Sequence, residues 1–321
     1  MKEYRNVISR TVRQLLLCGG LLLASCSQDN DLTDTSLPEG MCPLELTASI
    51  AGTSASSTRA TTGNIWIGDG TEKVAVRVST SPTENEYTLH QYTVRYSSLG
   101  MMTSDKPYYW QNTSSIWIRA WYPYQETLSS FTVPADQSTE AGFLRADFLC
   151  TKITEGFFNT PINIEFYHQT AKVVVNIKKE GIMADSPEVT VTLGCSDNTL
   201  YLTGNMNTNT IDSGNESNGL TAKTDGAQGI ILPFADTAAS DEYAATYQAL
   251  LIPQDIGGKK FIAITVGSIT CYYTPPTGTT LEGGYSYTYN VTLNTEGEVT
   301  VNNITVSSWT NHEGDIPLVT E

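Results

Sequence analysis

Histidine, cysteine and acidic side chains could build an active site or a metal site, and this sequence groups few of them. The 321 residues include three histidines, and His168 has no serine, cysteine or carboxylate constellation near it in sequence, which favours a structural histidine. Residues 212–219 are rich in oxygen ligands but lack the bidentate glutamate of a calcium loop, which favours a plain polar loop. G-x-S-x-G, H-E-x-x-H, P-loop and G-x-G-x-x-G motifs are absent from the sequence. The sequence therefore predicts a protein that is not an enzyme and has no cofactor, metal or catalytic residue.

Covalent modification is better supported than catalysis, first at Cys26. Four basic residues precede the apolar run 15–23, which is too short to span a bilayer, so residues 1–25 are predicted to be a signal peptide. The run ends in Leu23-Ala24-Ser25-Cys26, which resembles the bacterial lipobox. This resemblance implies that Cys26 carries lipid, palmitate included, and anchors a lipoprotein in the outer membrane. The alternative is an ordinary signal-peptide cleavage site with an incidental cysteine.

The charge of the chain excludes several partners. Eighteen basic residues stand against 34 acidic ones, for a formal net charge of −16 and a pI near 4.5. A nucleic-acid partner is excluded because phosphate backbones need a cationic surface. Docking on an anionic membrane through basic residues is excluded for the same reason. Abundant threonine, serine, asparagine and glycine, with 17 tyrosines, favour sheets and turns.

Apolar residues alternate with polar ones at period two in many short segments, each typical of a half-buried strand. No segment shows a sustained apolar pattern of helical period, so we predict an all-β protein built from two antiparallel β-sandwich domains. Residues 205–223 have almost no large apolar side chains and are predicted to form a surface excursion. The predicted strands are 73–78, 92–96, 115–122, 162–167, 172–177, 189–193, 261–266, 269–273, 285–293 and 299–306.

An earlier strand precedes an unusual loop. Leu44, Leu46, Ala48 and Ile50 lie on one face of this predicted strand. The following residues, 52–63, contain no apolar side chain larger than alanine, and Arg59 is their only charged residue. Such a segment is predicted to be an exposed loop that a protease can reach. The alternative is that Arg59 lies in a passive tether that is never cut.

Several segments, in order along the chain, resemble the fimbrillins, the subunits of type V pili of gut and oral anaerobes. The segments are Arg59-Ala60-Thr61 with residues 66–69, then 166–175, then 252–254 with 258–264, and finally 281–292 with Ile304 and Trp309. The resemblance implies a lipoprotein precursor with two transthyretin-like β-sandwich domains. It also implies that an arginine-specific, trypsin-like protease cuts between Arg59 and Ala60. A strand from a neighbouring subunit then fills the groove that the released strand leaves.

The resemblance also sets the expected organisation, location and partners. After the signal peptide we expect a tether and propeptide strand over 26–59, an N-terminal sandwich over 60–180 and a C-terminal sandwich over 181–321. The partners are other copies of the chain, related pilus subunits, the processing protease, the outer membrane through lipid, and a host or bacterial surface ligand of unknown identity. The function implied is cell adhesion as a surface-exposed pilus subunit.

The donor strand is left open between two interpretations. Val299 and Val301 lie on one phase of the last strand and Ile304 and Val306 on the other, so a bulge or bend is predicted at Asn302-Asn303. One hypothesis is that the tail 299–321 detaches and supplies the donor strand. The alternative is that it stays as the last strand of its own sandwich.

Aromatic residues, cysteines and one threonine give weaker signals. An aromatic cluster is expected to pack in the core, with a glycan-binding platform on a surface lipoprotein that does not polymerise as the alternative function. Cys42, Cys150, Cys195 and Cys271 are compatible with disulfides or with buried thiols. Thr237, in Asp-Thr-Ala, resembles an O-glycosylation acceptor. The aromatic cluster consists of Tyr108, Tyr109, Trp110, Trp117, Trp121, Tyr122 and Tyr124.

Overall fold

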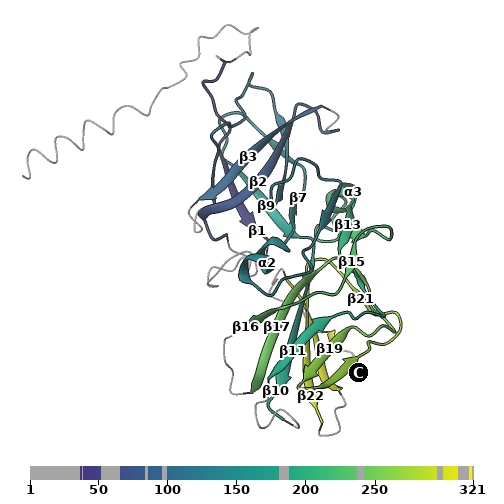
Figure 1. Cartoon of the computed structure of the whole chain (residues 1–321). Coiled ribbons are helices and arrows are strands. Elements are labelled where there is room, and N and C mark those ends of the chain that lie inside the picture. Colours follow the sequence, from purple (N-terminus) through teal and green to yellow (C-terminus); the bar gives the residue numbers. More distant parts are fainter. Residues whose placement is uncertain are drawn as a thin grey trace, which may run out of the picture. The chain divides into compact units, whose positions relative to one another are not determined.

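The computed structural model describes residues 37, 39–51, 66–83, 86–95, 100–180, 188–236, 242–294, 299–309 and 318–319. All of them belong to one compact unit, Leu37–Glu321. This part of the chain is nearly all β-strand, so the all-β prediction is confirmed (Figure 1). Each segment predicted from period-two alternation lies in or overlaps a strand. The division into two domains stays a prediction.

The first large sheet closes on itself. Its order is β2-β3-β4-β1-β9-β7-β5-β8, and β2 also pairs with β5, so seven of its strands form a ring. The inward side chains of this ring make their own hydrophobic core, which includes Val74, Val76, Ile118 and Ile164. The strands are β1 (Leu46–Ile50), β2 (Asp69–Ser79), β3 (Tyr87–Arg95), β4 (Met101–Thr103), β5 (Ile116–Tyr122), β7 (Leu149–Thr151), β8 (Thr154–Gly156) and β9 (Ile162–His168).

A six-stranded sheet and a three-stranded sheet share the second core. The six-stranded order is β16-β17-β10-β22-β23-β24, and the three-stranded order is β11-β19-β20. In β10, buried residues alternate with half-buried ones, as a strand with one face on a core requires. The strands are β10 (Ala171–Lys178), β11 (Val189–Leu193), β16 (Phe234–Asp236), β17 (Tyr243–Leu251), β19 (Ile262–Val266), β20 (Ile269–Tyr273), β22 (Tyr285–Leu293), β23 (Val299–Ser308) and β24 (Leu318–Val319).

Short elements complete the second core region. Two helices occur in the described residues, α2 (Glu140–Arg145) and α3 (Thr208–Asp212), each begun by a side-chain cap from Thr139 or Asn207. β6 pairs with β13, and β13 with β14, so residues before and after β10 contribute to one small sheet. The short strands are β6 (Ser130–Thr132), β12 (Leu200–Tyr201), β13 (Thr203–Met206), β14 (Leu220–Ala222), β15 (Gln228–Gly229), β18 (Gln254–Asp255) and β21 (Thr280–Leu281).

Two strand pairs correct the expectation of purely antiparallel sheets. β1 runs parallel to β9, and β10 runs parallel to β22. Sequence alternation sets the buried face of a strand but not the direction of its neighbour, which explains the difference. Sheet membership also changes before residue 180, because β9 ends at His168 in the ring and β10 begins at Ala171 in the six-stranded sheet.

The predicted surface excursion over 205–223 holds for most of its residues, which are exposed or half-buried, but the stretch also has regular structure. It contains α3 and β14, and its two large aliphatic side chains, Ile211 and Leu220, are fully buried, while Met206 is half-buried. Gly219 allows this packing, because a Cβ there would come within 2.7 Å of the Ile211 side chain. Two well-placed aliphatic residues are enough to hold a polar segment against the core.

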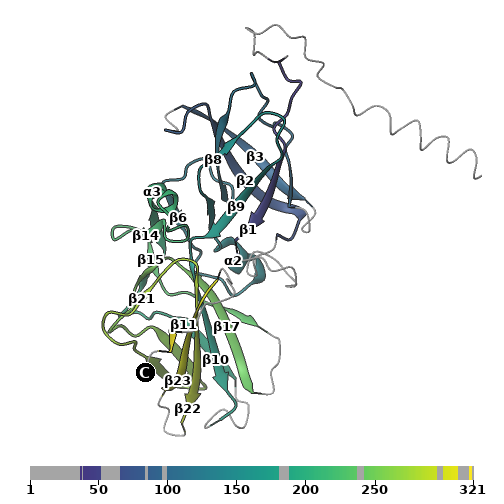
Figure 2. The same ribbon diagram turned by 180° about the vertical axis from the view of Figure 1, so that it is seen from behind.

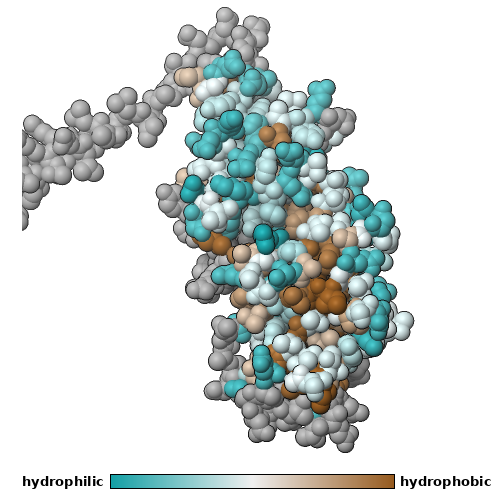
Figure 3. All heavy atoms as spheres, in the orientation of Figure 1, coloured by the Kyte–Doolittle hydropathy of each residue, from teal (hydrophilic) through white to brown (hydrophobic). Residues whose placement is uncertain are grey.

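The face shown in Figure 3 is mostly hydrophilic, with apolar residues gathered near β15. Leu232, which follows β15, has 44% of its surface exposed. Within the described ranges, no helix has the length and apolar character needed to cross a bilayer.

Candidate strand-exchange site

The predicted propeptide strand occupies an interior position in the ring. β1 lies beside β9 in both views (Figures 1 and 2) and pairs with it through five residues, from Leu46 opposite Ile162 to Ile50 opposite Phe166. Its other side pairs with β4, where Leu46 lies opposite Met102. β1 therefore has a hydrogen-bonded neighbour on each side, and without it β4 and β9 would each have an open edge.

Alternation along 44–50 places the large side chains in the core of the ring. Leu44, Leu46, Ala48 and Ile50 are only 3%, 4%, 5% and 1% exposed. The prediction that these residues form one buried face is confirmed. The opposite face is polar, and Thr47 donates a hydrogen bond from its Oγ1 to Asn163 on β9 at 3.1 Å.

Backbone hydrogen bonds also hold the residues on either side of β1. The Leu44 amide donates to the carbonyl of Tyr108 at 2.8 Å, and the Tyr92 hydroxyl donates to the Leu44 carbonyl at 3.2 Å. At the other end, the Ala51 amide donates to the carbonyl of Phe166 at 2.8 Å. The segment is thus held at both ends, from Leu44 to Ala51.

Gly100 contacts the backbone of β1, and the sequence alone did not identify this contact. Its φ is +56°, and a Cβ there would lie 1.9 Å from the carbonyl oxygen of Ala48. The Ala48 amide donates to the Gly100 carbonyl at 2.8 Å, so the two backbones approach closely. Only glycine combines this left-handed conformation with such a contact. The glycine before Met101 could have served as a sequence signal for this contact, but nothing in the sequence distinguishes it from the other glycines among the 25.

The chain that follows the predicted cleavage loop has its own anchor. Trp66 is 2% exposed, and its ring packs edge-on against Tyr122 and Phe166, with centroids 5.7 and 5.1 Å apart. The Glu72 carboxylate accepts the backbone amides of Ile67 at 2.9 Å and Gly68 at 2.8 Å. Burial raises the pKa of Glu72, an effect that these two amides oppose. This stretch is therefore held by contacts to residues outside β1, within the same core as β1.

β23 differs from β1 in its surroundings. It pairs with β22 through nine residues and with β24 through two, whereas β1 pairs with β9 through five and with β4 through two, so the two strands differ in side-chain burial rather than in the number of neighbours. Val299, Val301, Ile304 and Val306 pack on the second core while remaining half-buried. The register shifts between the pairs Asn290–Asn303 and Val291–Val301, which confirms the bulge predicted from the phase of the apolar residues.

Trp309 closes the end of β23 against a buried histidine. Its ring stacks on His168 with centroids 3.8 Å apart and planes 9° from parallel. His168 is fully buried, and its Nδ1 donates to Asp147 Oδ1 at 2.9 Å. The Trp309 amide donates to the Gly284 carbonyl at 2.6 Å. His168 is thus built into the packing, as the sequence predicted.

The aromatic cluster divides between core and surface. Tyr108, Trp110 and Trp121 are 9% exposed or less, which confirms the core packing expected of them. Trp117 remains half-buried on β5. The indoles of Trp110 and Trp121 are therefore closed to a ligand.

The four cysteines in the described ranges are thiols rather than disulfides. Cys150, Cys195 and Cys271 are buried, whereas Cys42 is partly exposed. Burial raises the pKa of the Cys150 thiol to about 12, which makes it a poor nucleophile. These residues therefore act as small apolar packing groups.

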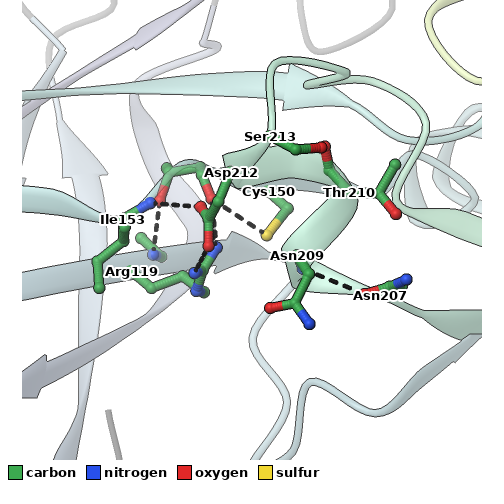
Figure 4. A network of polar contacts seen from close by, with 10 residues as sticks. Arg119, Cys150, Ile153, Asn207, Asn209, Thr210, Asp212 and Ser213 are labelled. Carbon is green, nitrogen blue, oxygen red and sulfur yellow. Dashed lines mark hydrogen bonds and ion pairs between the residues drawn. The ribbon is translucent and has the colours of Figure 1, made fainter. Parts of the chain in front are cut away.

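Asp212 opens the loop considered for calcium, but its carboxylate binds an arginine (Figure 4). Arg119 of β5 is 1% exposed and donates from NH2 to Asp212 Oδ2 at 2.6 Å and from NH1 to Oδ1 at 3.3 Å. The Ile153 amide donates to the same carboxylate at 3.1 Å. Among the described residues, no three His, Cys, Asp or Glu side chains are grouped to hold a metal ion. The pair links the ring to α3, across 93 residues of sequence.

Four predicted modification residues, Cys26, Arg59, Ala60 and Thr237, lie outside the described residues. Lipidation, cleavage and glycosylation at these positions therefore stay predictions.

Comparisons with known proteins agree with this fold. A candidate cell adhesion protein from Bacteroides ovatus has 21% sequence identity and a TM-score of 0.62, with 84% of this chain and 99% of that chain covered. A candidate cell adhesion protein from Bacteroides uniformis has 19% identity and a TM-score of 0.61, with 85% and 100% covered. At these identities the likeness concerns the fold alone. The sequence has no match among curated proteins.

A family comparison goes further than the solved structures. The model of the Fimbrillin-like family matches residues 58–309, which is most of the sequence, from just before Arg59 to Trp309. The chain therefore belongs to the fimbrillin-like family.

Proposed function

We propose that this chain is a structural subunit of a surface pilus that polymerises by strand exchange and supports cell adhesion. It is made as a lipoprotein precursor, anchored in the outer membrane through Cys26. An arginine-specific, trypsin-like protease cuts between Arg59 and Ala60 and releases residues 26–59 with β1. Copies of the chain and related subunits then assemble into a fimbrium that binds a ligand on a host or bacterial surface. Membership of the fimbrillin-like family supports this role.

The observation that carries the proposal is the interior position of β1. Its removal would open a slot between β4 and β9 that buries Leu44, Leu46 and Ile50 in the precursor. Burial of three large aliphatic side chains stabilises by roughly 5–9 kcal/mol as an upper estimate, before ladder hydrogen bonds are counted. An apolar slot with two open strand edges accepts a strand from another chain. Such a contact is heterologous and propagates into a filament.

The anchor at Trp66 supports processing in the preceding loop. The Glu72 carboxylate and the packing of Trp66 on Phe166 hold the chain from 66 onwards through residues that lie outside β1. A cut between Arg59 and Ala60 would therefore leave the rest of the ring attached to its core.

The C-terminal tail is the proposed donor. The inward residues before Ile50, which are Leu44 and then Leu46 and Ala48 of β1, run large, large, small. The tail repeats this order at Ile304, Val306 and Ser308. The apolar side chains of β23 are only half-buried, whereas those of β1 are 5% exposed or less, so β23 is less firmly held by side-chain burial than β1. The tail of one copy could thus occupy the slot of the next.

N-terminal sequencing and an unboiled gel test the central proposal. Residues 27–321 are treated with limiting trypsin, with an Arg59→Ala variant as the matched control. A new terminus at Ala60 together with a heat-labile ladder of multimers, both absent from the variant, is the expected result. Retention of 26–59, or a cut that yields only monomers, would reject it and favour a surface lipoprotein that binds glycans without polymerising.

A cysteine pair tests the donor and its register. With Ile304 at the place of Leu44, Ser307 takes the place of Thr47, opposite Met101 of β4. Met101 is 41% exposed and Ser307 is exposed, so cysteines at both positions are compatible with folding. Oxidation of cut Met101→Cys/Ser307→Cys chains should link subunits covalently, and the same variant with Arg59→Ala should stay monomeric. Normal polymers from chains lacking 310–321 and chains lacking 299–321 would exclude the tail as donor.

A further inference from the structure

A pocket of about 630 Å³ lies at one end of the ring, where β2 ends and β3 begins. Its floor includes Val78 and Tyr108, both buried, and its rim includes Tyr87 and Tyr109. This volume falls within the usual range of small-ligand sites, and the mouths of closed sheets are frequent places for them. The pocket is lined by ring strands, by the loop before β5 and by Glu39 and Gly40, and it involves no residue of the proposed donor strand.

Fixed aromatic rings form the walls of the pocket. Tyr87 is 51% exposed, and the guanidinium of Arg77 lies 5.0 Å from its ring centroid. The Tyr108 ring packs edge-on against His90 and Trp110, with centroids 5.8 and 6.4 Å apart. A half-exposed tyrosine held in place presents a rigid apolar face with a polar tip, which suits ligands that are apolar on one side and hydroxylated at the edge.

His90 lines the pocket as a binding wall rather than a catalytic base. Its Nδ1 lies 3.1 Å from the carbonyl oxygen of Lys106, which can only accept, so this nitrogen carries the proton. Its Nε2 lies 3.0 Å from the Thr88 hydroxyl and accepts from it. With both ring nitrogens engaged by protein groups, the arrangement points to binding without chemistry.

The charges of the pocket select against anions. The acidic side chains lining it are Glu39 and Glu86, and both are exposed at the rim. Carboxylates repel anionic ligands and accept hydrogen bonds from hydroxyl groups. The amide of Gln111 and the hydroxyl of Thr80 add further polar groups at the edge.

We infer that this pocket binds a neutral saccharide, with one hexose ring against Tyr87 and its hydroxyl groups on the polar rim. A hexose offers the combination that the pocket matches: a C–H face for an aromatic ring and uncharged hydroxyls for carboxylate and amide acceptors. The inference goes beyond the proposed pilus role and does not depend on strand exchange, because β1 and β23 contribute no lining residue.

The proposed processing would alter one wall of this site. Glu39 and Gly40 line the pocket and belong to the segment 26–59. On the proposed function, their departure would widen the pocket and remove one of its carboxylates, so processed subunits would bind a larger saccharide than the precursor does.

Saturation-transfer NMR on residues 27–321 with Arg59→Ala, which keeps the segment in place, tests the site apart from processing. The probes are maltose, cellobiose, lactose and N,N′-diacetylchitobiose, with sialyllactose as the anionic control. At least one neutral probe should bind below about 10 mM while sialyllactose does not. Tyr87→Ala should weaken that binding by about tenfold or more. Tyr272→Ala, which removes a tyrosine 41% exposed on β20, should leave it unchanged.

Two results would overturn the inference. The first is a folded chain that binds none of the four neutral probes. The second is binding that survives both Tyr87→Ala and Tyr109→Ala, since that would place the sugar elsewhere. Neither result bears on polymerisation, which the gel experiment measures separately.

Discussion

β1 and β23 are both strands with alternating apolar residues, yet the molecule holds them in different ways. β1 has a neighbour on each side and inward side chains that are 5% exposed or less. Each strand has one neighbour along its length and a second through two residue pairs, but the apolar side chains of β23 are only half-buried, and its best-buried contact is at its end, where Trp309 stacks on His168. On the proposed function, a strand whose side chains are buried along its length would leave only when the chain is cut and another strand takes its place. A strand whose burial is concentrated at its end would leave more readily once that end is freed.

The largest expected effect tests the end contact of β23. Trp309→Ala should lower the free energy of unfolding by about 3–5 kcal/mol, because it removes a buried ring and opens the His168–Asp147 pair to water. Urea denaturation followed by circular dichroism measures this change. Trp309→Phe, which keeps a ring over His168, is the control and should lose less. A loss within about 0.5 kcal/mol for the alanine variant would show that β23 is not anchored at its end.

Matched truncations sharpen the contrast along the two strands. Leu46→Ala should cost about 2–5 kcal/mol of unfolding free energy because it leaves a cavity in the ring core. Val306→Ala should cost only about 1 kcal/mol, since its side chain is half-buried. The same denaturation experiment gives both values, and equal losses would remove the distinction between the two strands.

Gly100→Ala tests how closely the backbone of β1 packs against Gly100. The new Cβ would meet the Ala48 carbonyl at 1.9 Å, and alanine at a φ of +56° adds strain, so a loss of about 2 kcal/mol is expected. Gly267→Ala is the control, because Gly267 has a φ of +60° with nothing within 4 Å of a Cβ. The control variant should therefore lose only the stability that backbone strain costs. If the two variants lost equal stability, close approach of β1 would be refuted.

The smallest effect concerns pH and the anchor after the cleavage loop. Burial raises the pKa of Glu72 above 4.5 in the folded protein, so folding favours its protonated form. The stability that this raised pKa contributes is complete below about pH 4.5 and is lost as pH rises through the folded-state pKa. The loss is about 1.4 kcal/mol for each unit by which the pKa of the folded state exceeds that of the unfolded state. The free energy of unfolding relative to Glu72→Gln should decrease over this window. Glu45→Gln, at an exposed carboxylate, is the control, and a slope of the opposite sign would contradict the prediction.

Local pattern predicted a large part of this structure. Alternation over 44–50 identified the buried face of β1, and the phase change around Asn302 identified the bulge in β23. Both features depend on neighbouring residues in one strand, where period two fixes which side chains face the core. The strand content was predictable for the same reason.

Features made by distant segments were not predictable from the sequence. The parallel pairing of β1 with β9 joins residues more than 110 positions apart, and the Arg119–Asp212 pair spans 93 positions. The burial of Ile211 in a polar stretch depends on a core built by other strands. The pocket proposed to bind a saccharide combines residues from four separate stretches, none of which carries a motif of its own.

The ladder around β1 also has a mechanical consequence. Hydrogen bonds to the antiparallel neighbour β4 run across the strand, and those to the parallel neighbour β9 run at a slant. In a filament where a donor strand takes the place of β1, tension along the fibre would pull the donor strand lengthwise. All of these hydrogen bonds would then be loaded at once, in shear. They cannot open one by one, as they would if the strand were peeled from one end. On the proposed function, the slot that would make assembly hard to reverse would thus also let an attached cell withstand drag.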